Sequence, residues 1–183
     1  MTTFTDRPNT ALLVIDVQNE VVENAFNRDA VVANIKTAVE RARGAGVAVV
    51  WVQHSDAGLM LESEGWQIVP ELEPLPTEPI VRKNYKSSFI ETNLDSVLEH
   101  LGVSKLIICG AESNHCVRHT SHSAFERGYD VTLISDAHTS NSYEWAGHKI
   151  SAEQVIDEQN DNLTNYEMPG RLATVQPLAE INF

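Results

Sequence analysis

The sequence predicts an α/β fold, a doubly wound, six-stranded and mostly parallel sheet with helices on both faces, arranged as a Rossmann-like three-layer sandwich. Two observations predict it. Short apolar runs alternate along the chain with segments in which apolar residues recur at helical spacing. The apolar runs are also uninterrupted, which is typical of strands buried on both faces of a parallel sheet. We expect the 183 residues, 1–183, to form one domain.

The first half of the chain supplies three of the expected strands. Residues 11–15 are continuously apolar and end at Asp16, and apolar residues then recur every fourth position over 31–42, as on one face of a helix. Gly44 and Gly46 are expected to end this helix, because glycine commonly follows the last helical turn. In order, we expect a strand at 11–15, a helix at 31–42, a strand at 47–52, an irregular excursion at 58–79 and a strand at 79–82.

The second half supplies the other three strands. Asn93 and Ser151 are of the type that caps helix N-termini, and Gly102 and Gly128 follow segments of helical spacing. Right-handed crossovers between the parallel strands then produce the doubly wound arrangement. In order, we expect a helix from Asn93 to Leu101, a strand at 105–109, a helix at about 114–127, a strand at 131–134, a helix from 151 to about 163 and a strand at 172–175.

The composition argues against several classes of protein. A formal net charge of -13 would repel a phosphate backbone, so we expect no nucleic-acid partner. The chain has no long apolar run, and residues 1–7 do not read as a secretory signal, so we expect a cytoplasmic protein that contacts no membrane. Two cysteines in different surroundings do not suggest a disulfide framework. A glycine-rich dinucleotide fingerprint is missing, which argues against a nicotinamide cofactor.

Cys116 is the residue with the clearest chemical meaning. An apolar strand leads into a polar turn that begins at Gly110, and the Cys116 thiol lies where a helix is expected to begin. The free N–H groups and partial positive charge of a helix N-terminus would favour the thiolate and could hold an oxyanion. Cys109 differs, because it lies inside the apolar strand and is expected to be a buried, inert side chain.

Two further reactive side chains are expected to lie beside Cys116. Asp16 follows the first strand and Lys83 follows the third, while Cys116 follows the fourth, and ligands bind at these carboxyl ends in an open parallel sheet. A carboxylate can take the proton of a thiol and return it to a leaving amine, and an ammonium holds that carboxylate in place. Taken singly, Asp16 could equally be a helix cap and Lys83 a surface lysine.

These residues lie in motifs of a known family. The chain resembles the isochorismatase-like cysteine hydrolases, which include nicotinamidases, N-carbamoylsarcosine amidohydrolases and biuret-type hydrolases. The resemblance extends from about residue 10 to about residue 178. The matching segments are Ala11 to Asn19, Lys83 with Tyr85, Ser88 and Phe89, Gly110 to Val117, Gly128 to Val131, and Asp136 with Ala137.

The resemblance implies a reaction and a role for each residue. Asp16 would be the general base, Lys83 its electrostatic partner and Cys116 the nucleophile. It also implies a cis peptide bond between Ala111 and Glu112, with the backbone N–H groups of Glu112 and Cys116 as the oxyanion hole. The implied function is cleavage of a C–N bond in a small amide, carbamoyl or urea-like molecule through a thioester. Isochorismatases proper lack the cysteine, which disfavours vinyl-ether hydrolysis.

The resemblance and the positions of the residues also suggest how the site is completed. We expect no metal and no other cofactor, because His54 and Asp56 are too few to form a metal site. The partner is expected to be a small-molecule substrate, and members of the family are usually homodimers or homotetramers. By position, the candidates for lining the substrate pocket are Gln18, His54, Trp66, Tyr85, Phe89 and His115.

Two other functions stay open at this point. The chain could be a non-catalytic or redox-sensing Rossmann-like binding module, with Cys116 as an oxidisable thiol. It could also hydrolyse a small ester or carbamate, which would use the same site with another leaving group. The polar partners Asp16 and Lys83 favour hydrolysis over sensing, because a sensor needs no group that returns a proton.

Overall fold

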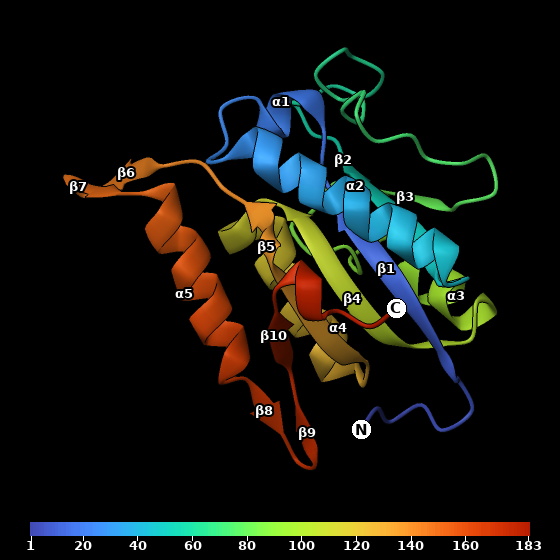
Figure 1. Cartoon of the computed structure of the whole chain (residues 1–183). Coiled ribbons are helices and arrows are strands. Elements are labelled where there is room, and N and C mark those ends of the chain that lie inside the picture. Colours follow the sequence, from blue (N-terminus) through green and yellow to red (C-terminus); the bar gives the residue numbers. More distant parts are fainter.

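The computed structural model describes residues 1–183 and contains one six-stranded sheet in which all neighbouring strands are parallel (Figure 1). Its order along the sheet is β10-β5-β4-β1-β2-β3. The chain thus reverses its direction of travel between β1 and β4, as a doubly wound sheet does at its switch point. The predicted fold class is confirmed. The strands are β1 (Asn9–Ile15), β2 (Ala48–His54), β3 (Ile80–Lys83), β4 (Val103–Ala111), β5 (Asp130–Thr139) and β10 (Thr174–Gln176).

Helices cover both faces of the sheet, which explains the uninterrupted apolar strands. Along β1, Leu12 and Val14 pack into one apolar cluster and Leu13 and Ile15 into the other, and all four side chains are at most 1% exposed. Alternation along a strand therefore divides one apolar run between two cores. The first core includes α2 (Arg28–Gly44), and the second includes residues of α3 (Leu94–His100), α4 (Arg118–Arg127) and α5 (Ala152–Thr164).

The helices begin and end close to where the sequence predicts them. Ser151 caps α5 as predicted, since its hydroxyl accepts a hydrogen bond from the Gln154 N–H while the Gln154 side chain accepts one from the Ser151 N–H. The main difference lies before α4. Residues Ser113–Val117 form a separate turn of π-helix, so the expected helix at 114–127 divides into this turn and α4.

Several short elements were not predicted. The strand expected at 172–175 is wrong in its bounds, because the last sheet strand is β10 and the preceding residues form a two-stranded hairpin. The other short elements include a second hairpin, whose strands are exposed, and one helical turn. They are too short or too polar to show a periodic pattern of apolar residues, so the sequence does not predict them. These elements are α1 (Asn19–Val22), β6 (Tyr143–Trp145), β7 (His148–Ile150), β8 (Glu167–Met168), β9 (Arg171–Leu172) and a 3₁₀ turn (Leu178–Glu180).

A bulge lengthens β5 beyond the strand expected at 131–134. Ile108 of β4 pairs with Leu133, but Gly110 pairs with His138, so Cys109 alone lies opposite residues 134–137 of β5. The extra residues re-aim the strand, as bulges do. Pairing then resumes beside the end of β4, which brings the polar segment from His138 onward next to the turn that carries Cys116.

The excursion at 58–79 is irregular, as predicted, yet it is packed against the sheet. Its only strand-like contact is one bridge between Ile68 and Gln18. Val69 and Leu72 are nevertheless buried in the first core. None of the helices in the chain combines the length and the apolar character that crossing a membrane requires.

Candidate active site

The structure brings the three predicted side chains into contact at the carboxyl ends of the strands. Lys83 Nζ lies 2.6 Å from Asp16 Oδ2 and 3.1 Å from Cys116 Sγ. Asp16 and Lys83 are each 1% exposed, whereas Cys116 is partly exposed. Lys83 therefore joins a buried carboxylate to a thiol that an incoming molecule can reach.

Backbone conformation at two positions makes this contact feasible. Asp16 has φ 50°, a left-handed conformation that is uncommon for a residue with a side chain. Gly110, at the end of β4, has φ 127°, and a Cβ atom there would overlap the carbonyl oxygen of Ile15. Glycine thus lets the ends of β1 and β4 approach each other, which sets Asp16 beside the turn that carries Cys116.

The ionisation state of Cys116 differs from the sequence-based expectation. Cys116 lies inside the π-helical turn and not at the first residue of α4. Burial, reinforced by the negative charge of Asp16, raises the pKa of the Cys116 thiol to about 12, and Lys83 offsets this only in part. The expectation of a stabilised thiolate is therefore wrong, because desolvation outweighs the nearby cation and the helix terminus. The resting group is a thiol, and its proton needs an acceptor.

By position, Asp16 is the candidate acceptor. Burial raises the pKa of the Asp16 carboxyl, while the charge and hydrogen bond of Lys83 and a hydrogen bond from Cys116 act in the opposite direction. A raised pKa makes the carboxylate a stronger base, while the charge and hydrogen bond of Lys83 favour its ionised form. Asp16 does not cap α1, because the N-cap of that helix is Gln18.

The turn before Cys116 carries the backbone features that the resemblance implies. The peptide bond between Ala111 and Glu112 is cis, as predicted. The carbonyl oxygen of Glu112 accepts hydrogen bonds from the N–H groups of His115 and Val117. The N–H group of Glu112 has no acceptor within the chain, so it is free to bind a ligand oxygen. The oxyanion-hole role of the Glu112 and Cys116 N–H groups stays a prediction.

Three of the six pocket candidates lie at or near the surface of the site. His54 Nδ1 is 3.4 Å from Lys83 Nζ, and its Nε2 is 3.1 Å from Asp56 Oδ2. His115 is partly exposed, and its Nδ1 lies 2.9 Å from the nitrogen of Lys86. Tyr85 is 49% exposed. Direct contact with substrate stays a prediction for these three.

The other three candidates have structural roles in this fold. The Gln18 side chain is fully buried, accepts a hydrogen bond from the His54 N–H, and donates to the carbonyl oxygens of His54 and Trp66. It ties β1 to β2 and to the excursion. Because its oxygen and nitrogen are both occupied by backbone groups, a substrate would have to displace them.

Trp66 and Phe89 are both buried and pack against other side chains, and their contact with substrate stays a prediction. The Trp66 ring stacks on Arg82, which points to the opposite side of β3 from Lys83 because successive strand residues alternate. Phe89 packs in the second core against Tyr129, with Arg127 at the end of α4 over its ring. From the sequence alone, an apolar residue in the segment after a strand can equally pack in the core or line a pocket.

The surface cavities and the potential metal ligands of the chain do not extend the site beyond the triad. Five surface cavities have no triad residue in their lining, and one of about 440 Å³ lies at the opposite end of the sheet, beside Thr10 and Lys105. No three His, Cys, Asp or Glu side chains form a group that could hold a metal ion. His54 and Asp56 thus have no third ligand, and the absence of a metal stays a prediction.

Sequence reasoning missed a set of polar residues behind the turn. His138 on β5 and Asn160 on α5 connect to Ser113, and Asn141 donates a hydrogen bond to Glu112 Oε1 over 2.8 Å. The polar run 138–142 after Asp136 was the only signal available. It could not be used, because the strand was expected to end at Ile134.

Comparisons with known proteins agree with the fold. The chain matches the Isochorismatase domain model over residues 10–175. It is 37% identical over 138 residues to a streptothricin hydrolase of Streptomyces noursei, covering 72% of this chain and 55% of that protein. It therefore spans only about half the length of that relative.

Two further relatives cover more of their own length. The chain is 31% identical to the ureidoacrylate amidohydrolase RutB of Enterobacter sp., an alignment that covers 75% of this chain and 81% of that one. A solved structure described as a cysteine hydrolase from Pseudomonas syringae pv. phaseolicola superposes with a TM-score of 0.85 at 25% identity. That superposition covers 94% of this chain and 90% of the other.

Proposed function

This chain belongs to the isochorismatase family, and from that premise we propose that it is a cysteine-dependent hydrolase that cleaves a C–N bond in a small molecule. The substrate would be an amide, a carbamoyl compound or a urea-like compound. Relatives named streptothricin hydrolase and ureidoacrylate amidohydrolase support hydrolysis of such bonds. The observation that carries the proposal is the contact of Lys83 Nζ with both Asp16 and Cys116, at 2.6 and 3.1 Å.

The first half of the proposed reaction uses all three side chains. Asp16 takes the proton of the Cys116 thiol, and the thiolate attacks the substrate carbonyl carbon, so that an S–C bond forms. The resulting oxyanion would accept hydrogen bonds from the N–H groups of Glu112 and Cys116. When the C–N bond breaks, protonated Asp16 gives its proton to the leaving nitrogen, and ammonia or an amine departs. Cys116 then carries the acyl group as a thioester.

The second half restores the enzyme. Asp16, again ionised, takes a proton from a water molecule whose oxygen attacks the thioester carbon. The S–C bond breaks, the thiolate recovers the proton from Asp16, and the product leaves as a carboxylic or carbamic acid. Throughout the reaction, Lys83 offsets the negative charge that moves between Asp16 and Cys116.

The same geometry argues against a redox-sensing module. Redox-sensor cysteines are accessible thiols of low pKa, because the thiolate is the species that oxidants attack. Burial raises the pKa of Cys116 to about 12, so the unassisted thiol is a poor sensor. A base in contact with the thiol suits a reaction in which substrate binding triggers proton transfer. Ester or carbamate hydrolysis at the same site differs only in its leaving group, and a substrate panel includes it.

The proposal is tested by product release and by trapping. We expect the purified protein to release ammonia or an amine from at least one member of a panel of small amides, N-carbamoyl compounds, ureas and esters. Acid quenching during turnover should give an intact mass increased by the acyl group, located at Cys116. Asp16→Asn should lower kcat/KM by about 100- to 10,000-fold, as loss of a general base does. A Cys116→Ala variant that keeps the activity would refute the proposal.

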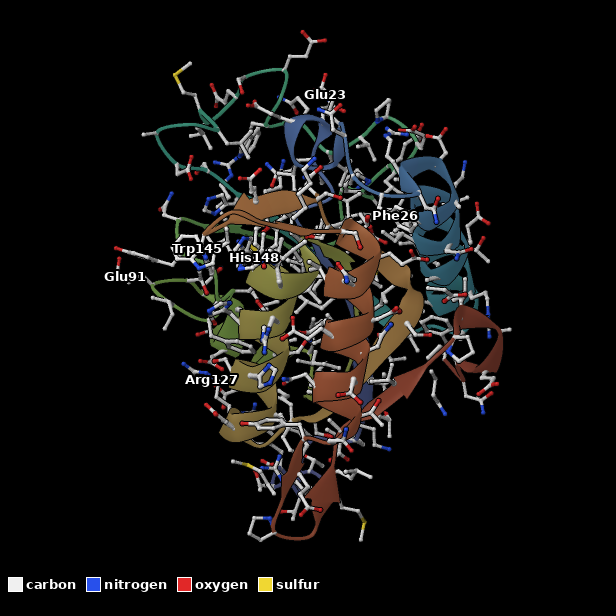
Figure 2. All side chains as sticks on the ribbon, turned by 90° about the vertical axis from the view of Figure 1, so that its left-hand side faces the viewer. Glu23, Phe26, Glu91, Arg127, Trp145 and His148 are labelled. Carbon is white, nitrogen blue, oxygen red and sulfur yellow. The ribbon has the colours of Figure 1, made fainter.

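We also propose that the chain assembles as a homodimer or homotetramer. Trp145 is 74% exposed and Tyr143 is 45% exposed, both on β6. Figure 2 shows Trp145 and His148 on the hairpin of β6 and β7, which Figure 1 shows projecting from the rest of the chain. Aromatic side chains are enriched in protein interfaces. Light scattering should give a multiple of the subunit mass that Trp145→Ser lowers, whereas a wild-type mass of one subunit would contradict the assembly.

A further inference from the structure

His138 is a buried titratable side chain that the proposed reaction does not use. It is 1% exposed and lies between the turn that carries Cys116 and helix α5. Its Nδ1 is 2.8 Å from Ser113 Oγ, and its Nε2 is 2.9 Å from Asn160 Oδ1. A buried histidine with both nitrogens engaged has a fixed ring orientation, so these two contacts are geometrically specific.

The hydrogen-bond directions follow from the neighbouring groups. Asn160 uses its Nδ2 to donate to the carbonyl oxygen of Ser135, which leaves its Oδ1 to accept from His138 Nε2–H. Nδ1 of the neutral ring then accepts a hydrogen bond from the Ser113 hydroxyl. Burial lowers the pKa of His138 and so favours the neutral ring. In the neutral ring, Nδ1 accepts from Ser113 while Nε2–H donates to Asn160.

Two further contacts join the residues after β5 to the start of the turn. Ser140 Oγ donates to Asn114 Oδ1 over 3.0 Å, and Asn141 Nδ2 donates to Glu112 Oε1 over 2.8 Å. With Ser113, three consecutive residues of the turn are therefore held by side chains from 138–141. Of the three contacts, only that of His138 is continued to another helix.

We propose that His138 is a positioning residue that fixes the turn Ser113–Val117 against α5 and so holds Cys116 Sγ in contact with Lys83 and Asp16. The inference rests on the proposed function of Cys116 as a nucleophile and adds how that nucleophile is kept in place. Misplacing a reacting atom by about 1 Å can lower a rate by about 100-fold, so a rigid support behind the turn has a direct kinetic value.

The chain contains its own matched control. His122 on α4 also bonds to α5, with its Nε2 3.1 Å from Asn162 Oδ1, and its Nδ1 lies 2.8 Å from the carbonyl oxygen of Arg118. Figure 2 shows α4 and α5 side by side. The hydrogen bond between His122 and Asn162 joins the two helices. The His122–Asn162 pair fastens α5 to α4, whereas His138–Asn160 fastens α5 to the active-site turn. Comparing the two separates positioning of Cys116 from general anchoring of α5.

The first measurement needs no substrate. His138→Gln, which removes the acceptor at Nδ1, should release the turn and expose the thiol, so alkylation of Cys116 by iodoacetamide at pH 8 should become at least about threefold faster. His122→Gln should change that rate by less than about 1.5-fold. The rate is measured on the full chain by mass spectrometry, with Cys109 as the buried internal reference. An unchanged or slower rate in His138→Gln, or an equal increase in His122→Gln, overturns the inference.

A second pair of variants tests the same contact with a smaller perturbation. Ser113→Ala removes only the donor to His138, and Ser113→Thr keeps it. Alkylation should be faster in the alanine variant and close to wild type in the threonine variant, with thermal melting recorded for each. Equal rates in the two variants would contradict the role of the hydroxyl.

Turnover supplies the readout that distinguishes the two proposals. With any substrate found in the panel, His138→Gln should lower kcat by about 10- to 100-fold while KM changes by less than about twofold, since the chemical step and not binding depends on placement. A protein that cleaves nothing in the panel but shows the alkylation difference would refute the hydrolase and support the positioning role. An active protein without the alkylation difference would support the hydrolase and refute the positioning role of His138.

Discussion

The interior of β4 and the turn that follows it each contain one cysteine, and their difference shows what makes a thiol useful here. Cys109 is fully buried, and its Sγ has only the Leu13 carbonyl oxygen, at 3.9 Å, as a polar neighbour. Burial raises the pKa of Cys109 and that of Cys116 alike. The two thiols therefore share a preference for the protonated form. Only Cys116 has a carboxylate and an ammonium beside it, so access to a proton acceptor, and not a low pKa, distinguishes the thiol that we propose as the nucleophile.

The largest expected effect follows directly from that difference. Cys116→Ala should lower kcat/KM by at least about 1,000-fold, because removal of a nucleophile leaves only the remaining polar groups of the site to act. Cys109→Ala should leave kcat/KM within about twofold and lower the free energy of unfolding by about 1 kcal/mol through a small cavity. Both variants are measured with the same substrate and by urea unfolding. Similar losses of activity in the two would show that the cysteines are not functionally distinct.

Lys83 tests whether the polar partners, and not the position in the turn, set Cys116 apart. Lys83→Met leaves the buried Asp16 carboxylate without its counter-charge, and breaking a buried ion pair in this way costs about 3–5 kcal/mol of unfolding free energy. The activity should also fall, by about 100-fold, because protonated Asp16 no longer accepts the thiol proton. Lys36→Met, at an exposed position of α2, is the control and should change stability by less than about 0.5 kcal/mol. Equal stability of the two variants would mean that Lys83 and Asp16 do not form a coupled pair.

The triad could be predicted because each of its members follows a clear local pattern. Asp16, Lys83 and Cys116 all follow apolar runs, and the handedness of parallel connections brings the ends of those strands to one edge. No side-chain contact had to be known. The strand order β3-β2-β1-β4-β5-β10 then confirms the neighbour relation between β1 and β4 on which the prediction depended.

The remaining parts of the site depend on tertiary structure that no local pattern encodes. His138 reaches the active-site turn only because β5 resumes after a bulge, and a bulge has no periodic signature. The π-helical turn before α4 similarly moves Cys116 away from the helix start and changes its expected ionisation. Gln18 and Trp66 were assigned to the pocket by position, and that position does not reveal that the Gln18 side chain bonds to the backbone of His54 and Trp66. Their contact with substrate stays a prediction.

The smallest expected effect is a shift in the pH dependence of kcat/KM. It bears on the comparison of Cys109 with Cys116, because both thiols ionise only far above neutral pH and only Cys116 has a carboxylate beside it. Burial raises the pKa of Asp16 above its ordinary value of 3.8, and the reaction needs the ionised carboxylate. Activity should therefore be lost as pH falls through this raised pKa, so the acid limb of kcat/KM should lie above 3.8.

The alkaline side should behave in the opposite way to that of a preformed thiolate. Burial raises the pKa of Cys116 to about 12, and Asp16 removes the thiol proton only during the reaction, so kcat/KM should not rise between pH 7 and about pH 10. A thiol that ionised on its own near its ordinary value of 9.0 would instead give a rate that increases tenfold per pH unit below that value. Measuring kcat/KM against pH in buffers of constant ionic strength distinguishes the flat profile from the rising one. A rate that follows the ionisation of a free thiol would show that Cys116 ionises like an ordinary exposed cysteine. Asp16 would then not be the acceptor of its proton.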